Sequence, residues 1–195
     1  MVRLFNLPYD KGGEIADKGK NHINHEIVNM SLANNFFKLP LPKSIDKKYF
    51  DYIINIIDEY YISKYKSNAY VEIITLTEKY SIISTVTEIT VMAIVEAISL
   101  FKLKYANIYI AGGGIYNDYL IKRIFTISSH KKITELNQIN FLRCNISKKN
   151  IYPEYIESQG MAFLAARFCY VKPSSFKYTT GINKNNIILG DLVRY

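Results

Sequence analysis

Residues 107–114 read Asn-Ile-Tyr-Ile-Ala-Gly-Gly-Gly, and this stretch decides the fold. A short apolar run that ends abruptly in three glycines indicates a β-strand followed by a tight turn. Apolar residues then return at helical spacing, at Leu120, Ile121, Ile124 and Phe125. The segment therefore predicts a strand, a glycine turn and a helix.

Helices are expected upstream of this strand. Asp46 can cap one helix whose apolar positions recur three and four residues apart, namely Phe50, Ile53, Ile54, Ile57 and Tyr61. A long, largely buried helix should follow, with one face formed by Ile82, Val86, Ile89, Ala93, Ala97 and Leu100. Residues 62–80 have β-propensity without clean alternation and stay ambiguous. Residues 6–20 are typical of a loop, and residues 23–32 of a short helix.

Downstream, a second strand is predicted over residues 139–142 and a helix over residues 153–167, with Pro153 at its first turn. The order helix, strand, helix, strand, helix predicts an α/β chain with a mostly parallel segment of sheet. No repeat or linker interrupts it. We therefore expect one domain over residues 1–195, with a loop and short helix in 1–45 and an α/β core in 46–195.

Composition argues against several classes of function. The net charge is +8, but 20 of the 25 basic residues are scattered lysines, which favours a solvated surface over a nucleic-acid interface. Two cysteines, Cys144 and Cys169, form no CxxC pair and fit a reducing compartment. The N-terminus lacks the features of a secretory signal, and the apolar region 89–101 is shorter than the ~20 residues that span a bilayer. A soluble cytoplasmic protein without membrane contact is expected.

Gly112, Gly113 and Gly114 are the most informative local feature. A strand that delivers three glycines to a helix lets the backbone approach a ligand closely, and nucleotide binding is the natural interpretation. Close packing of the helix on the strand is an equally good structural explanation. The dinucleotide fingerprint does not fit, because its third glycine position is occupied by Asn117.

Other candidate residues have structural explanations. His22, His25 and Glu26 have the wrong spacing for a zinc motif, so no metal site is predicted. Glu157 opens an otherwise small and apolar helix, where an acid also complements the helix dipole. No Ser-His-Asp or Cys-His arrangement and no Walker-type phosphate loop occurs in the sequence.

Several motifs, in register over nearly all 195 residues, resemble the second half of the anhydro-N-acetylmuramic acid kinases, bacterial enzymes of the sugar kinase, Hsp70 and actin superfamily. They are Pro8-Tyr9-Asp10-Lys11 with Gly13 and Gly19-Lys20; Pro42-Lys43-Ser44 with Tyr49-Phe50; Thr87-Glu88-Ile89-Thr90; Ala111 to Gly114 with Asn117, Leu120 and Arg123; residues 156–167; and Thr180-Gly181 with Leu189-Gly190. The chain departs from the family pattern at Gly12, at Ile45, Asp46 and Lys47, and at Asp118. An insertion falls between about residues 60 and 80.

The resemblance implies the C-terminal lobe of an actin-like (RNase H-like) ATPase fold, with a mixed sheet flanked by helices. It implies ATP and Mg²⁺ as cofactors, with Gly112, Gly113, Gly114 and Asn117 at the nucleotide and Glu157 facing the amino-sugar substrate. The implied reaction opens the ring of 1,6-anhydro-N-acetylmuramic acid and gives N-acetylmuramic acid 6-phosphate, a step of cell-wall recycling. The resemblance also implies a homodimer.

The family's catalytic base lies in a D-T-G-P-G-N motif, which would precede Met1, as would the phosphate loops. No catalytic residue is therefore predicted within this chain, and neither Asp10 nor Asp17 is proposed as one. The chain would be inactive alone, as a truncated half, as a split half that assembles with a separately encoded N-terminal half, or as a lobe kept for another role. The alternative is a non-catalytic binding lobe that contacts a partner protein or an anionic polymer.

Overall fold

The computed structural model describes residues 4–43, 46–101, 106–130, 139–143, 152–176, 183 and 187–190. Its α-helices (α), 3₁₀-helices (η) and strands (β) run in the order η2 (Lys11–Gly13), α1 (Glu14–Lys18), η3 (Lys20–His22), α2 (His25–Leu32), α3 (Asn35–Lys38), η4 (Lys47–Asp51), α4 (Tyr52–Tyr65), α5 (Tyr70–Ile73), α6 (Leu76–Leu100), β1 (Ala106–Ile110), η5 (Gly113–Tyr116), α7 (Asp118–His130), β2 (Ile139–Arg143), η7 (Pro153–Tyr155) and α9 (Ile156–Cys169). The described part of the chain is thus a mostly helical α/β structure.

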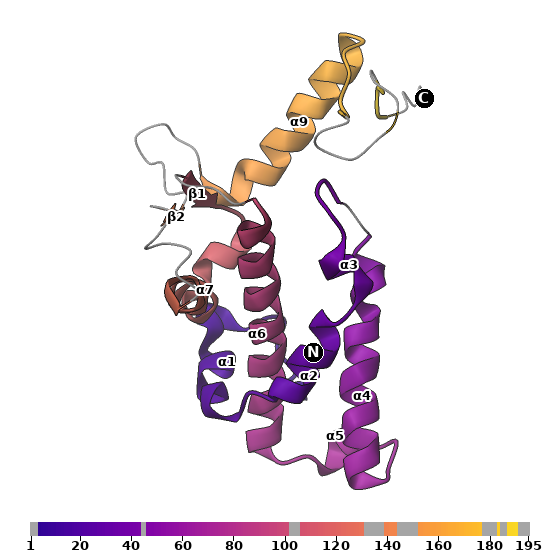
Figure 1. Cartoon of the computed structure of the whole chain (residues 1–195), viewed down its shortest axis with the longest axis vertical. Helices are drawn as coiled ribbons and strands as arrows, with labels where there is room; N and C mark the ends of the chain where they lie inside the picture. Colours follow the sequence, from indigo (N-terminus) through magenta and orange to yellow (C-terminus); the bar gives the residue numbers. More distant parts are fainter. Residues whose placement is uncertain are drawn as a thin grey trace.

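Helix α6 is the central element, with α1, α2 and α7 packed against it and α4 beyond α2 (Figure 1). Two apolar clusters hold these helices together. One joins α2, α4, α5 and α6 around Ile27, Ile57, Tyr61 and Ile82; the other joins α6 and α7 around Val91, Val95 and Ile124. Burial of these large side chains supplies the main driving force for the packing.

The segment that the sequence left ambiguous, residues 62–80, is helical where α4 ends, at α5 and where α6 begins. Thr75 starts α6 with a capping box, because its hydroxyl accepts the N–H of Glu78 while the Glu78 carboxylate accepts the N–H of Thr75. Of the β-branched residues there, Ile74 is buried in the core, whereas Val71 and Ile73 are exposed.

The predicted helical faces are confirmed in part. On α4, Ile57 and Tyr61 are buried, whereas Ile54 is 47% exposed. On α6, Ile82 and Ile89 are buried, whereas Leu100 is exposed at the end of the helix. Sequence reasoning missed a second face of α6, which consists of buried polar residues: Ser81, Ser84, Thr85 and Glu88.

The sequence predicted that the apolar region 89–101 is too short to cross a bilayer, but the helix that contains most of this region is longer than expected. Helix α6 has 25 residues and, by length and composition, could cross a membrane; 44% of its most apolar window is buried within the structure. Its polar face bonds to the chain around it: Ser84 donates to the carbonyl of Ala16, and the hydroxyl of Thr85 accepts the N–H of Asn24 at 2.9 Å. These contacts make α6 the core helix of this fold.

Residues 6–20, expected as a loop, contain η2, α1 and the start of η3. The reason is Asp10, whose two carboxylate oxygens accept the N–H groups of Ile15 and Ala16 at 2.9 and 3.0 Å and so satisfy the start of α1. Gly19 then allows close approach to α6, because a Cβ there would lie 2.2 Å from the carbonyl oxygen of Tyr80.

The strand, turn, helix order around the three glycines is confirmed. Strands β1 and β2 pair in parallel, with Ala106 opposite Ile139 and Ile110 opposite Arg143. Helix α7 follows the turn, and α9 begins after Pro153 and extends away from the helical body (Figure 1). Near the C-terminus, Ser175 and Ile187 form an isolated antiparallel bridge.

Candidate functional site

The glycine turn lies between β1 and α7 and is open to its surroundings. Gly112 has φ +84°, in the left-handed region that favours glycine. Gly113 does not have a left-handed backbone, and a Cβ at Gly113 would meet no described atom within 4 Å. At Gly114, a Cβ would lie 3.9 Å from the Leu120 side chain and would meet no other described atom within 4 Å. Close packing, the alternative explanation for the glycines, therefore does not account for Gly113.

The turn is bonded to the start of the helix that carries Glu157. The N–H of Gly112 donates to the carbonyl oxygen of Pro153 at 3.1 Å, and Pro153 opens η7, which runs directly into α9. Glu157 lies in the first turn of α9 and is exposed. No hydrogen bond or ion pair joins its carboxylate to the described part of the chain. The structure thus brings together two features that the sequence singled out separately.

Asn117 has a structural role at the other end of the turn. Its Oδ1 accepts the N–H of Leu120 at 2.8 Å and so caps the start of α7. Its side chain also lies against Gly13, where a Cβ would come within 2.1 Å of the same oxygen. Asn117 therefore joins η2 to α7.

Glu88 on α6 and Arg123 on α7, both motif residues, form an ion pair. Arg123 Nε lies 2.9 Å from Glu88 Oε2, and Arg123 Nη2 lies 2.6 Å from Oε1. The Glu88 side chain is only 4% exposed. This hydrogen bonding with Glu88 raises the pKa of the Arg123 guanidinium above its ordinary value.

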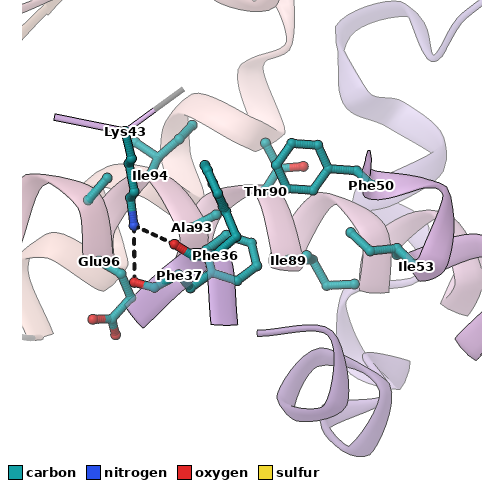
Figure 2. Close-up of a pocket in the computed structure, with 11 residues that line it drawn as sticks. Phe36, Phe37, Lys43, Phe50, Ile53, Ile89, Thr90, Ala93, Ile94 and Glu96 are labelled. Carbon is teal, nitrogen blue, oxygen red and sulfur yellow. Dashed lines mark hydrogen bonds between the residues drawn. The ribbon is translucent and has the colours of Figure 1, made fainter. Parts of the chain in front are cut away.

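Lys43, from the Pro-Lys-Ser motif, closes the C-terminal end of α3. Its Nζ donates to the carbonyl oxygens of Phe36 and Phe37 at 2.9 and 3.1 Å and lies over the Phe36 ring (Figure 2). Cations are favoured at this end of a helix because its carbonyls carry partial negative charge. Ser44 and Ile45, which follow in the sequence, lie outside the described residues.

Beside Lys43 is an apolar cavity of about 420 Å³ between α3, α4 and α6. Figure 2 shows the rings of Phe36, Phe37 and Phe50 and the α6 residues Ile89, Thr90 and Ala93 around it. The hydroxyl of Thr90 bonds back to the carbonyl of Val86, so it is already satisfied. The glycine turn does not line this cavity, which we treat as a packing feature rather than as the site.

Arg167, the last residue of the motif at 156–167, connects α9 to residues 173–176, which follow the helix. Its guanidinium donates to the carbonyl of Pro173 and lies over the rings of Phe163 and Phe176. Gly190, of the Leu-Gly motif, has φ +117° and lies next to Phe168. Thr180 and Gly181 lie outside the described residues, as does Cys144, whereas Cys169 is an exposed free thiol.

The motif residues thus fall into two groups. Asp10, Lys43, Glu88, Asn117 and Arg167 all have partners within the chain. Gly113 and Glu157 have no such structural explanation among the described residues, and they lie on either side of the Gly112–Pro153 bond. Such residues are candidates for contacts with a ligand.

Sequence reasoning missed the tyrosines around this junction. Tyr116 in η5 is 55% exposed, and Tyr152 and Tyr155, on either side of Pro153, are 51% and 57% exposed. The last two rings contact each other edge to face, with centroids 6.0 Å apart. Exposed aromatic rings beside an open backbone suit the flat face of a nucleobase. Only their positions beside the turn, which sequence cannot give, distinguish them from the other tyrosines.

No metal centre is visible in the part of the chain that the structure describes, where no three His, Cys, Asp or Glu side chains lie close enough to hold an ion. His22 and His25 are both exposed. Asn24 between them caps α2, because its Oδ1 accepts the N–H of Ile27 at 3.1 Å.

Comparison with known proteins matches this chain to one family. The family model for anhydro-N-acetylmuramic acid kinase matches residues 2–194. The anhydro-N-acetylmuramic acid kinase of Bacillus cereus strain AH187 is 31% identical over 198 residues, which cover 97% of this chain and 44% of the relative. That of Coxiella burnetii strain Dugway is 24% identical over 183 residues, covering 94% and 42%.

A third relative, the anhydro-N-acetylmuramic acid kinase of gamma-proteobacterium EBAC31A08, is 33% identical over 124 residues, covering 64% of this chain and 29% of the relative. The chain therefore spans less than half the length of these curated relatives. Because the family model matches almost every residue, the chain belongs to the anhydro-N-acetylmuramic acid kinase family.

Proposed function

We propose that this chain forms the nucleotide-facing and sugar-facing part of an ATP-dependent kinase that converts 1,6-anhydro-N-acetylmuramic acid into N-acetylmuramic acid 6-phosphate, in cell-wall recycling in the cytoplasm. One observation carries the proposal: the Gly112–Pro153 hydrogen bond joins the open glycine turn to the helix of Glu157. In this proposal residues 1–195 are the C-terminal lobe of an actin-like fold, and β1 and β2 belong to a larger mixed sheet.

At the nucleotide, Gly112, Gly113 and Gly114 would offer backbone without a Cβ to the adenosine of ATP. The open space at Gly113 supports this role. Asn117 has already committed its Oδ1 to the α7 cap, so a contact with the nucleotide would use its Nδ2. The exposed ring of Tyr116 or Tyr155 would add stacking on the adenine.

At the sugar, the Glu157 carboxylate would accept hydrogen bonds from the substrate. The first turn of a helix is a favourable place for a negatively charged side chain, because the helix dipole is positive at that end. Each hydrogen bond from a sugar hydroxyl to a charged acceptor contributes roughly 1.5–3 kcal/mol when it is shielded from water. Glu157 would therefore bind and orient the sugar without taking part in proton transfer.

In the proposed reaction, the oxygen of a water bonds to the anomeric carbon while the bond from that carbon to O6 breaks. The freed O6 takes the γ-phosphoryl group of ATP, and ADP leaves. A carboxylate base takes the proton of the water, and catalysis of the phosphoryl step is mostly positioning and charge stabilisation. Mg²⁺ would neutralise charge on the phosphates, and we assign neither its ligands nor the base to this chain.

We propose that the base and the phosphate loops lie in the family sequence that this chain does not match, in the same or a separately encoded polypeptide. The 195-residue chain would then bind nucleotide and sugar but not catalyse turnover, and the assembled enzyme would be a homodimer. Catalysis by the chain alone, detected as N-acetylmuramic acid 6-phosphate formed from 1,6-anhydro-N-acetylmuramic acid and Mg-ATP, would contradict this division of roles.

Saturation-transfer NMR with 1,6-anhydro-N-acetylmuramic acid tests the sugar site. The wild-type chain should bind the sugar, and Glu157→Gln should weaken binding roughly tenfold, because it removes the charge from the acceptor. Glu72→Gln is the matched control, since Glu72 is equally an exposed glutamate but lies on α5. Equal affinity of wild type and Glu157→Gln would remove Glu157 from the site.

A further inference from the structure

The position of the glycine turn depends on α7, which continues directly from it. The turn and α7 are tied together by two bonds: the N–H of Asn117 donates to the carbonyl of Gly114 at 3.1 Å, and Asn117 caps α7 through Leu120. Ile115 is 5% exposed, so the middle of the turn is anchored in the interior. A shift or rotation of α7 would therefore move the turn with it.

Helix α7 is in turn held on α6 by the Glu88–Arg123 pair. Both carboxylate oxygens of Glu88 are engaged, by Arg123 Nε at 2.9 Å and Nη2 at 2.6 Å. A bidentate pair fixes direction as well as distance, because the planar guanidinium and the carboxylate must lie nearly in one plane. Apolar contacts around Val91, Val95 and Ile124 also hold the two helices together. Such contacts tolerate a small shift of one helix along the other more readily than the ion pair does.

Stability alone is a poor explanation for this pair. The Glu88 side chain is 4% exposed and that of Arg123 25% exposed, so both charges lose much of their hydration. Apolar residues of similar volume often replace a buried ion pair at no cost, or even stabilise the fold. The pair is instead suited to selecting a single arrangement of α7 on α6.

We propose that Glu88 and Arg123 are positioning residues for the glycine turn: their bidentate pair sets α7 on α6 in the arrangement that holds Gly112–Asn117 ready for the nucleotide. The inference rests on the proposed function for the nucleotide, but the positioning of the turn can be measured without it.

The first measurement is hydrogen exchange of the backbone amides of residues 112–117 in the 195-residue chain. In Glu88→Gln and in Arg123→Lys, which lose the paired geometry but keep similar side chains, exchange at these amides should accelerate roughly tenfold. Glu78→Gln is the matched control. Glu78 forms an ion pair of the same 2.6 Å length with Lys64, at the other end of α6, and should leave exchange in the turn unchanged.

A double variant separates positioning from stability. Glu88→Leu with Arg123→Met removes both charges, so the melting temperature should return to near that of wild type. Exchange at the turn should stay fast, because the bidentate contact that sets the direction of α7 on α6 is then absent. If the amides of residues 112–117 exchange as slowly in the double variant as in wild type, the pair has no positioning role and the inference is wrong. The same holds if neither single variant changes exchange at these amides.

The second measurement is the affinity for Mg-ADP by calorimetry. Wild type and Glu78→Gln should bind alike, and Glu88→Gln and the double variant roughly tenfold more weakly. If wild type does not bind Mg-ADP although exchange in the turn responds as expected, the proposed nucleotide function fails while the positioning stands. If wild type binds and Glu88→Gln binds equally well, the inference fails while the nucleotide function stands.

Discussion

The N–H of Gly112 donates a 3.1 Å hydrogen bond to the carbonyl oxygen of Pro153, and this bond joins the glycine turn to the first turn of α9. On one side lies Gly113, where a Cβ would meet no described atom within 4 Å; on the other lies the exposed residue Glu157. The proposed nucleotide and sugar sites rest on this arrangement, in which an open backbone lies beside an exposed acid.

Acid should weaken the contact between α4 and α6. Burial of the Glu78 carboxyl opposes ionisation, but hydrogen bonds from Lys64, Tyr65 and Thr75 outweigh this and lower its pKa from 4.5 to about 2. A folded-state pKa below the unfolded value means that the unfolded chain takes up the proton first. The stabilisation is therefore complete above about pH 4.5 and is lost as the pH falls toward 2.

Thermal melts of wild type and Glu78→Gln between pH 2 and pH 7 check this prediction. Glutamine can still cap α6 but carries no charge. Wild type should melt roughly 2–4 °C higher at neutral pH, as expected for about 1 kcal/mol, and the difference should disappear toward the folded-state pKa. Glu72→Gln, which alters an exposed acid on α5, should have no such effect. A difference that is constant across the pH range would show that the charge contributes nothing.

Filling the cavity beside Lys43 should stabilise the fold. Ala93 on α6 lines this apolar space of about 420 Å³, so Ala93→Leu adds methyl groups where room exists. We expect a gain of about 0.5–2 kcal/mol, and a melting temperature higher by roughly 2–4 °C for each kcal/mol. Ala165→Leu, at an exposed position of α9, is the control and should change little. A lower melting temperature for Ala93→Leu would mean that the cavity cannot accept the side chain.

Helix α9 should mediate self-association of the isolated chain. No residue of α9 is buried, and Met161 and Phe163 are each 61% exposed, so the helix leaves apolar surface uncovered. Such surface favours contact between copies. Sedimentation velocity should find Met161→Lys more monomeric than wild type at equal concentration. Met30→Lys, at a methionine of α2 that is 49% exposed, should behave like wild type; equal association of all three proteins would contradict this role for α9.

The elements that the sequence predicted best are those with a strong local signal. The strand before Gly112, α7 after it and α9 after Pro153 all lie where the pattern indicated. The sequence pattern missed α1, because the start of this helix depends on one side chain that precedes it. Asp10 starts α1 by accepting the N–H groups of Ile15 and Ala16, and this turned an apparently irregular segment into a helix.

The sequence predicted which residues belong to the candidate site, but not how these residues are arranged. The glycines and Glu157 could be named from their motifs, and Asn117 was expected at the nucleotide, although its Oδ1 serves a helix cap. The pairing of Glu88 with Arg123 and the bond from Gly112 to Pro153 join residues far apart in the chain, and periodicity contains no such information. The buried polar face of α6 escaped notice for the same reason, since its partners lie on other elements.

Titration of the isotope-labelled chain with Mg-ADP, followed through its backbone amide resonances, tests whether the glycine turn faces the nucleotide. Saturable shifts should be concentrated at residues 112–117 and at the start of α9. Gly113→Ala, which should alter stability by less than about 1 kcal/mol, should weaken binding roughly tenfold, because the new Cβ would occupy the space of the ligand. Saturable shifts elsewhere, or an unchanged affinity of Gly113→Ala, would contradict the claim that this turn faces the nucleotide.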